Sequence, residues 1–136
     1  MAEEYHIDRA QGIIWSRCWG VLSDEDIATQ QARLRTDPNF DPTLSQLVDC
    51  REVTDVTLSV GTVKRLGQSK LFSPESKRAY IVAKDVVFGL VRMYELYQKL
   101  RDAHSVRIFR DRAEAVLWLG VKDSAAHIPP RSRDKT

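Results

Sequence analysis

Few residues in this 136-residue sequence have the types and spacing that catalysis or metal binding requires. The three histidines, His6, His104 and His127, lie far apart along the chain, and Cys18 and Cys50 lack the close spacing typical of zinc ligands. No serine stands in a G-x-S-x-G context, and the glycines form neither a G-x-G-x-x-G nor a P-loop pattern. We therefore expect no catalytic residues, no metal site and no cofactor, and we expect that the protein is not an enzyme.

Two neighbouring residues at the end of a predicted strand allow alternative interpretations. Asp49 can line a cleft at the carboxyl edge of a sheet, where α/β proteins bind ligands, or it can accept hydrogen bonds from the backbone of the following loop. Cys50 can be a reactive thiol or a small buried apolar side chain. Other acidic pairs, such as Asp24 and Asp26, stand where a helix is predicted to begin, and there they favour capping.

The pattern of apolar residues predicts strands that alternate with helices after an initial hairpin. Two β-rich runs, residues 5–8 and 12–19, predict that hairpin, with a loop of about three residues between them. The remaining elements are a helix that begins at Ser23 and ends before Thr36, strands over 44–50, 77–84 and 105–109, and helices over 58–71, 86–103 and 113–121. The order ββαβαβαβα predicts an α/β domain with largely parallel strands and right-handed crossovers.

Charge and composition restrict the class of protein. The chain carries a formal net charge of +2, and the basic excess lies entirely in residues 122–136. We therefore expect a single domain over 1–121 with a polar tail, and no basic groove for nucleic acid. No apolar run approaches the ~20 residues of a membrane span, and the acidic start is not a secretory signal. With two cysteines interpreted as reduced thiols, we expect a cytoplasmic protein.

The predicted helix over 86–103 has an unusual distribution of apolar residues. At about 100° per residue, one line of side chains is predicted to face the core, namely Val86, Leu90, Met93, Tyr97 and Leu100. Phe88 and Val91 then fall on the opposite, polar side, beside Arg92. They can cover a neighbouring loop, form a homodimer contact or line the entrance to a ligand site, since exposed apolar patches usually mark interactions.

Four segments resemble the SpoIIAA-like family, also described as STAS/SEC14-type domains. They are residues 12–14 in the hairpin, 48–51 at a strand end, 88–95 in the long helix and 106–119 in the closing strand and capped helix. The resemblance extends from Tyr5 to about Val121. It implies a mixed sheet of four or five strands with helices mainly on one face.

The resemblance implies two further kinds of site. Anti-sigma factor antagonists of this fold are phosphorylated on a serine in an Asp-Ser-x-Gly context, whereas here Asp55 is followed by Val56. Thr57 and Ser59 supply the nearby hydroxyls, and either is a phosphorylation site or a helix N-cap. Lipid-transfer relatives of the wider fold bind apolar molecules between sheet and helix. Their resemblance makes three aromatic residues candidates for ligand contact or for core packing, namely Trp15, Trp19 and Tyr94.

These observations predict a non-enzymatic binding or regulatory module that acts through protein–protein contact or homodimerisation. The predicted interaction residues are Phe88, Val91, Arg92, Tyr94, Trp15 and Trp19. One alternative is a carrier or sensor of a small apolar, lipid-like molecule. A second alternative is a partner-switching protein regulated by phosphorylation, resembling anti-sigma factor antagonists.

Overall fold

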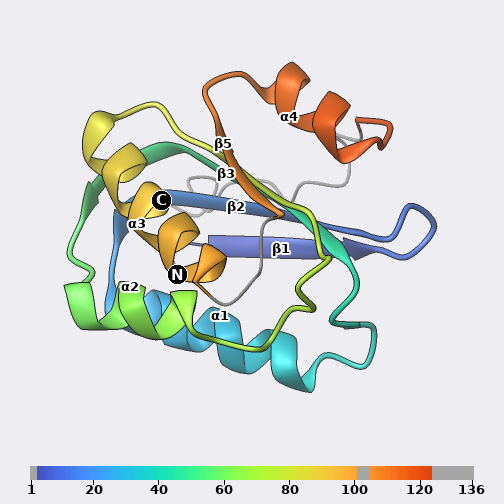
Figure 1. Cartoon of the computed structure of the whole chain (residues 1–136), viewed down its shortest axis with the longest axis horizontal. Coiled ribbons are helices and arrows are strands. Elements are labelled where there is room, and N and C mark those ends of the chain that lie inside the picture. Colours follow the sequence, from blue (N-terminus) through green and yellow to red (C-terminus); the bar gives the residue numbers. More distant parts are fainter. Residues whose placement is uncertain (1–2, 101–104, 124–136) are drawn as a thin grey trace, which may run out of the picture.

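The computed structural model describes residues 3–100 and 105–123, and in this part of the chain a five-stranded sheet has the strand order β1-β2-β3-β4-β5 (Figure 1). β1 is antiparallel to β2, and the other neighbouring strands are parallel. This arrangement confirms the predicted order and the predicted mixed sheet. The elements are β1 (Glu3–Asp8), β2 (Ile13–Leu22), α1 (Asp24–Thr36), β3 (Ser45–Val56), α2 (Val60–Gly67), β4 (Arg78–Ile81), α3 (Asp85–Lys99), β5 (Val106–Phe109) and α4 (Arg112–Leu119).

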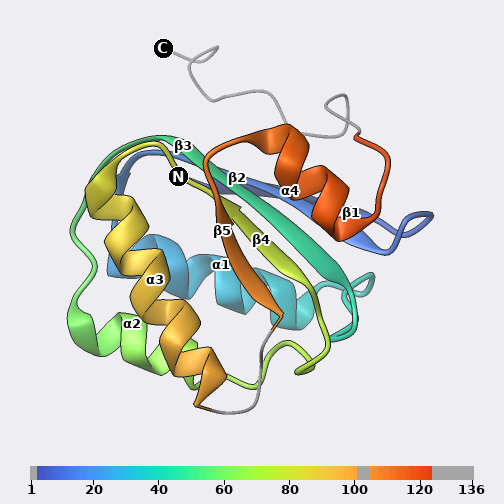
Figure 2. The same cartoon turned by 45° about the horizontal axis from the view of Figure 1, so that its top comes forward.

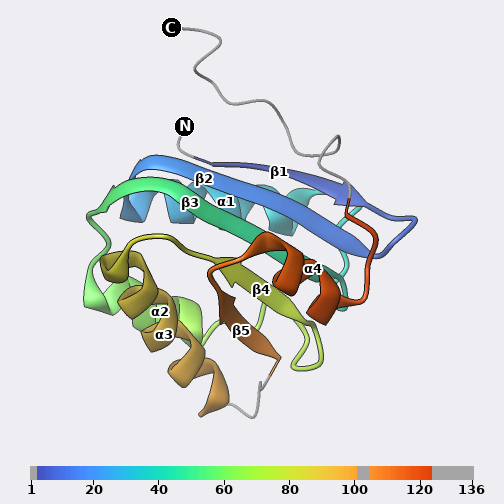
Figure 3. The same cartoon turned by 90° about the horizontal axis from the view of Figure 1, so that it is seen from above.

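The helices are divided unequally between the two faces of the sheet. Figure 1 shows α1 and α2 on the side of the sheet opposite to α4, and Figures 2 and 3 show α4 lying alone across the other side. The core contacts place α3 with α1 and α2, because Val87 packs with Val48 and Cys50 of β3. We call these sides the three-helix face and the α4 face. The prediction that helices lie mainly on one face is confirmed.

Alternation of side chains along the strands supplies both faces with a core. On β2, Ile13 and Trp15 point to the α4 face, where they pack with Leu47 of β3 and Val116 of α4. Cys18 of the same strand points to the three-helix face. Ile13, Trp15 and Leu47 have no exposed surface, so the central strands are covered on the α4 face. β2 is therefore covered on both sides of the sheet.

Local hydrogen bonds set the ends of the helices. Ser23 caps α1, since its hydroxyl accepts from the backbone N–H of Asp26 and the Asp26 carboxylate accepts from the backbone N–H of Ser23. Asp111 caps α4 by accepting from the backbone N–H of Ala113. α4 ends at Gly120, whose φ of 71° lies in the left-handed region that glycine adopts without a Cβ clash. The predicted start at Ser23 is confirmed.

The predicted strand ends require correction. We expected a loop over residues 51–57, but β3 continues to Val56 and pairs with β2, which itself continues to Leu22. The pairing of β2 with β3 continues through two register shifts. One of them lies beside Gly20, whose φ is 67°. The polar residues that suggested a loop, Arg51, Glu52, Thr54 and Asp55, are exposed along this extension. α2 and β4 are in turn shorter than predicted.

The predicted inward side of α3 is wrong at both ends of the helix, although Leu90 lies on the inner side as expected. Val86 and Leu100, which we expected in the core, are 53% and 81% exposed. Phe88 and Val91, which we expected on the polar side, pack instead against the core of the three-helix face. α3 has this orientation because its inner side carries polar side chains that form hydrogen bonds inside the protein. The main one is Gln98. Apolar spacing alone assigned such residues to solvent.

The proposed tail, residues 122–136, lies outside the described residues except for Lys122 and Asp123. Lys122 donates its backbone N–H to Gln11, and Asp123 accepts from Arg112. The division into a domain over 1–121 and a tail stays a prediction. Within the described residues, none of the helices has both the length and the apolar character needed to cross a membrane.

Candidate functional site

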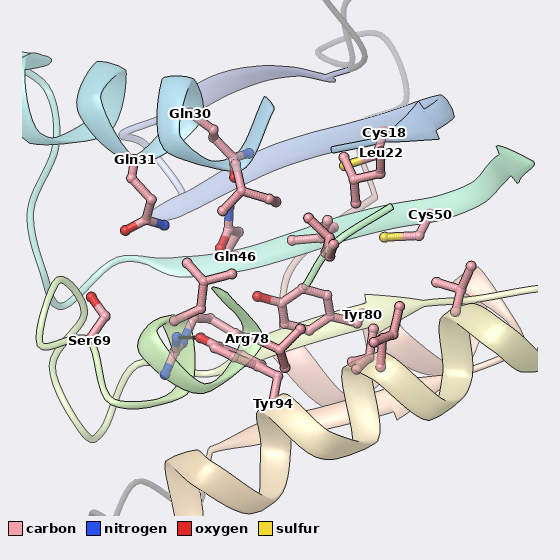
Figure 4. Close-up of a pocket in the computed structure, with 18 of the residues that line it drawn as sticks. Cys18, Leu22, Gln30, Gln31, Gln46, Cys50, Ser69, Arg78, Tyr80 and Tyr94 are labelled. Carbon is pink, nitrogen blue, oxygen red and sulfur yellow. Dashed lines mark hydrogen bonds between the residues drawn. The ribbon is translucent and has the colours of Figure 1, made fainter. Parts of the chain in front are cut away.

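A cavity of about 110 Å³ lies between the three-helix face of the sheet and the helices α1, α2 and α3 (Figure 4). A single water molecule needs about 10–15 Å³ on the same measure, so the cavity has room for a small organic molecule. Most of its wall is aliphatic or aromatic. The lining residues are Cys18, Leu22, Ile27, Gln30, Gln31, Leu34, Gln46, Val48, Cys50, Val56, Leu58, Val63, Leu66, Ser69, Leu71, Phe72, Arg78, Tyr80, Val87, Leu90, Val91 and Tyr94.

The strands give the cavity a polar end and an apolar end. Gln46 and Arg78, the early residues of β3 and β4, pair with each other in the sheet and both line the cavity. Two residues further along each strand, on the same face, come Val48 and Tyr80. Figure 4 places Gln46 and Arg78 at a distance from Cys18, Leu22 and Cys50, which lie toward the other end. The cavity is therefore amphipathic along the strand direction.

Arg78 is the most unusual residue of the cavity wall. It is only 3% exposed, and its guanidinium donates to the Tyr94 hydroxyl and, at 2.7 Å, to Gln98 Oε1. The guanidinium carbon also lies 4.8 Å from the centre of the Phe72 ring, within the range of a cation–π contact. The buried Nε atom has no hydrogen-bond partner. Within residues 3–100 and 105–123, no ion pair joins Arg78 to a carboxylate.

Gln98 connects this arginine to the contact between α2 and α3. Its side-chain amide donates to the carbonyl oxygen of Gly67 at the end of α2, while its carbonyl oxygen accepts from Arg78. The two helices approach closely here, since a Cβ atom placed on Gly67 would lie 2.2 Å from Tyr97 Cβ. Glycine at this position is therefore what lets α2 pack directly on α3. The same contact holds Gln98 and Arg78 in place.

Two glutamines complete the polar end. Gln46, 3% exposed, donates from Nε2 to the Ser16 hydroxyl at 2.9 Å on the neighbouring strand. Gln31 reaches the cavity from α1, and its side-chain Oε1 is buried without a hydrogen-bond partner. Buried polar atoms nearly always have a hydrogen-bond partner. The unpaired acceptor Gln31 Oε1 and the unpaired donor Arg78 Nε, both in the wall of this cavity, therefore need an explanation.

Two further titratable groups of the wall, Cys18 and Tyr80, have raised pKa values. A hydrogen bond between the side chains of Cys18 and Cys50, together with burial, raises the pKa of the Cys18 thiol well above its usual value of 9.0. Burial and the neighbouring Tyr94 raise the pKa of Tyr80 well above 10.0. Because the thiolate is the reactive form of cysteine, such a thiol is a poor nucleophile. Cys50 is 5% exposed and packs in the core of the three-helix face, which supports its interpretation as a small apolar side chain.

The structure separates the six predicted interaction residues. Tyr94 and Val91 line the cavity, and Phe88 packs on the adjoining core, with the Arg110 guanidinium 5.0 Å from its ring centre. Arg92 is exposed and pairs with Glu95 at 3.5 Å.

The two tryptophans do not line the cavity. Trp15 is buried on the α4 face, where its indole N–H donates to Asp8 and the Arg112 guanidinium lies 5.5 Å from its ring centre. Trp19 is half-buried beside Arg17. Of the three aromatic candidates for ligand contact, the structure therefore brings only Tyr94 to the cavity.

Asp49 has the structural role that was one of its two alternatives. Its carboxylate accepts from the backbone and side chain of Arg51, with the shortest contact at 2.7 Å, and pairs with Arg112 at 3.6 Å. Burial alone would raise the pKa of Asp49, but the hydrogen bonds and charges of these arginines outweigh it and hold the pKa below its usual value. Asp49 points to the α4 side and does not line the cavity.

The two candidate phosphorylation sites also have hydrogen bonds. Ser59 is the N-cap of α2, accepting from the backbone N–H of Thr62 at 3.1 Å. The Thr57 hydroxyl donates to the carbonyl oxygen of Leu22 at 3.4 Å. Capping is thus observed for Ser59, and phosphorylation of either residue stays a prediction. The described residues contain no group of three or more histidine, cysteine or acidic side chains placed to hold a metal ion.

Sequence reasoning missed Arg78 and Gln46 at the polar end of the cavity, and it missed Gln98, which accepts a hydrogen bond from Arg78. A signal was present for the first two. Each is a polar residue at the start of an otherwise apolar strand, in phase with residues that face the same side, as in Arg78-x-Tyr80 and Gln46-x-Val48. Gln98 had no such signal, because a glutamine in an amphipathic helix usually faces solvent.

The comparisons with known proteins identify the fold. The structure is similar to that of an uncharacterized protein from the DUF3478 family with a SpoIIAA-like fold, from Shewanella loihica PV-4. The TM-score is 0.57 and the sequence identity 20%, and the match covers 87% of this chain and 94% of that chain. No family model and no curated protein matches the sequence. The chain therefore has the SpoIIAA-like fold that the sequence segments predicted.

Proposed function

We propose that this protein is a non-enzymatic binding module that carries or senses a small, largely apolar molecule, held between the sheet and α1, α2 and α3. The observation that carries the proposal is the cavity of about 110 Å³ on the three-helix face. Its wall combines many apolar side chains with a few buried polar groups. Sites for small molecules have this composition, since apolar surface supplies affinity and a few polar groups fix orientation.

The residues around the cavity favour binding over catalysis. Tyr80 and Cys18 are held neutral, and the acid nearest in sequence to Cys50, Asp49, is engaged with Arg51 on the other side of the sheet. No base stands beside a nucleophile in the wall. The chemistry that remains is recognition by shape, apolar contact and hydrogen bonding.

Titration with the uncharged alcohol 1-octanol, followed by NMR of the backbone amides, tests this function. We expect saturable shifts at residues whose side chains line the cavity, Val48 and Tyr80 among them. Val48→Phe, which fills the cavity from the sheet, should weaken octanol binding at least tenfold. Val21→Phe is the matched control, because Val21 is 51% exposed on β2 and does not line the cavity. Shifts that do not saturate, or that Val48→Phe leaves unchanged, would refute the proposal.

A second candidate function, homodimerisation, has a separate observation in its favour. Val86, Leu96 and Leu100 are 53%, 49% and 81% exposed, and at about 100° per residue they fall on one side of α3. Exposed apolar patches usually mark interaction sites. This stripe replaces Phe88 and Val91 as the surface for contact with a second copy.

Sedimentation velocity tests the dimer. We expect wild type to associate with rising concentration and Leu96→Asp to remain a monomer. Leu117→Asp serves as the control, because Leu117 is 81% exposed on α4, on the other face of the sheet. A wild-type protein that stays monomeric at high micromolar concentration contradicts this second candidate and leaves the cavity proposal untouched.

A further inference from the structure

The charge of Arg78 has no counterpart in the described part of the cavity wall. Among the described residues that line the cavity, only Arg78 carries a formal charge, and it is 3% exposed. Burying a cation without a partner is costly, because water no longer solvates it and no carboxylate compensates it. A ligand with a negative charge would compensate the charge of this group.

The structural contacts of Arg78 account for only part of its hydrogen-bonding capacity. Its two terminal nitrogens donate to Tyr94 and Gln98, which fixes the guanidinium between β4 and α3. Both partners are neutral, so the positive charge remains. Nε–H remains as well, a buried donor without an acceptor. The contacts with Tyr94 and Gln98 position the guanidinium of Arg78. They leave its Nε–H donor and its positive charge to interact with a ligand.

A second unpaired atom lies on the other side of the same end of the cavity. Gln31 enters from α1, opposite to Arg78 in Figure 4, and its Oε1 atom is buried without a partner. A primary amide has both an acceptor and two donors, and rotation about its last bond exchanges them. Gln31 can therefore donate to an acidic group that Arg78 binds. The two residues supply donors from opposite walls.

The rest of the cavity suits a hydrocarbon body. Beyond Val48 and Tyr80 the wall consists of aliphatic side chains and the two thiol groups, with Cys18, Leu22 and Cys50 at the far end in Figure 4. No second cation lines the cavity within the described residues, which favours one negative charge rather than two.

From this arrangement, and resting on the proposed function, we infer that the ligand is a small amphipathic carboxylic acid. Its carboxylate accepts from Arg78 Nε–H at the polar end, and its hydrocarbon body extends along the strands toward Leu22 and Cys18. A guanidinium forms strong, charge-assisted hydrogen bonds with carboxylates, and in a dry cavity these bonds are stronger than in water.

Three ligands with the same hydrocarbon chain and different head groups test which head group the protein prefers. NMR titrations of the wild-type chain at pH 7 compare octanoate, 1-octanol and octylammonium, which differ mainly in the charge at one end. We expect octanoate to bind at least tenfold more tightly than octanol, and octylammonium more weakly than either. Contacts measured by the nuclear Overhauser effect should place the terminal methyl near Leu22 and the carboxyl end near Gln46.

Variants of two arginines then test whether Arg78 causes the preference for the carboxylate. Arg78→Met should reduce octanoate affinity to that of octanol while octanol affinity stays within about twofold of the wild-type value. Arg107→Met is the control, because it removes a positive charge from the neighbouring strand β5 at an exposed position that does not line the cavity. Circular dichroism checks that each variant folds, and if Arg78→Met does not, the three probes on wild type decide alone.

The outcomes separate the inference from the proposed function. Equal affinities of wild type for octanoate and octanol, or an acid preference that survives in Arg78→Met, overturn the inference and leave the apolar carrier standing. If none of the three probes binds, the proposed function fails and the inference fails with it.

Discussion

The two faces of the sheet use the same strands but differ in how completely they are filled. On the α4 face, Trp15, Leu47 and Ala79 have no exposed surface and pack directly against one short helix. On the three-helix face, the alternate residues Val48 and Tyr80 border a cavity of about 110 Å³. A single helix lying flat on the sheet closes one face, whereas three helices around the other leave space between them. We therefore attribute the stability of the fold mainly to the first face and propose binding at the second.

The largest effect is expected from removing the main side chain of the filled face. Trp15→Ala should lower the free energy of unfolding by about 3–5 kcal/mol, because the surrounding side chains cannot close so large a void. Trp19→Ala on the same strand is the control, with a smaller loss, since Trp19 is only half-buried. Urea unfolding followed by circular dichroism measures both. Equal losses for the two variants would contradict the assignment of the core to the α4 face.

The next effect concerns the helix contact that supports the cavity. In Gly67→Ala the new methyl group meets Tyr97 Cβ at 2.2 Å, so α2 and α3 must separate, at a cost of about 2–3 kcal/mol in unfolding free energy. Gly61→Ala in the same helix meets its first neighbour at 3.6 Å and should be neutral or stabilising by up to about 1 kcal/mol. Thermal unfolding compares the pair. If Gly67→Ala is as stable as Gly61→Ala, α2 and α3 do not pack as described.

A smaller, pH-dependent effect is expected at Asp49, which joins β3 to α4 through Arg112. Asp49→Asn should lower the free energy of unfolding by about 2 kcal/mol at pH 7, because it removes the charge from hydrogen bonds to arginine. Asp55→Asn, at an exposed position of the same strand, should change it by less than about 0.5 kcal/mol.

The sign of the pH dependence follows from the lowered pKa of Asp49. The folded protein favours the carboxylate, so its stabilisation is fully present above the usual pKa of 3.8 and is lost as pH falls through the lower pKa of the folded state. The difference between wild type and Asp49→Asn should therefore be constant near neutral pH and shrink below pH 3.8. Urea unfolding across this range measures it, and a difference that grows as pH falls would refute the assignment.

The smallest effects are expected from enlarging one buried side chain on each face of the sheet, which tests how much free space each face contains. Ala79→Val adds two methyl groups to the filled face and should cost about 1–2 kcal/mol of unfolding free energy through overpacking. Val48→Ile adds one methyl group on the cavity side and should change stability by less than about 0.5 kcal/mol, or increase it. Thermal unfolding detects both. A loss for Val48→Ile as large as that for Ala79→Val would show that the three-helix face has no free space.

The sequence predicted the architecture well because the fold depends on periodic burial. The β-rich runs identified the hairpin that contains β2, and Ser23 with its acidic neighbours identified the start of α1. The extension of β3 to Val56 was missed, since Arg51 and Glu52 resemble a loop when the pairing partner is unknown. Strand pairing is a long-range property that local composition does not specify.

The candidate site was harder to predict because it depends on polar side chains that are buried. Apolar spacing placed Phe88 and Val91 outward on α3, because such spacing does not account for a buried polar residue like Gln98 on the true inner side. The partners that make this burial possible, Arg78 and the carbonyl of Gly67, belong to distant parts of the chain. Hydrophobicity cannot reveal such a pairing.

A crystal structure of the wild-type chain with bound octanoate tests the central claim most directly. We predict electron density for octanoate inside the cavity, with a carboxylate oxygen within about 3.2 Å of Arg78 Nε and the methyl end beside Leu22. A core that the protein's own side chains fill completely, with octanoate absent or bound only on the outer surface, would contradict it.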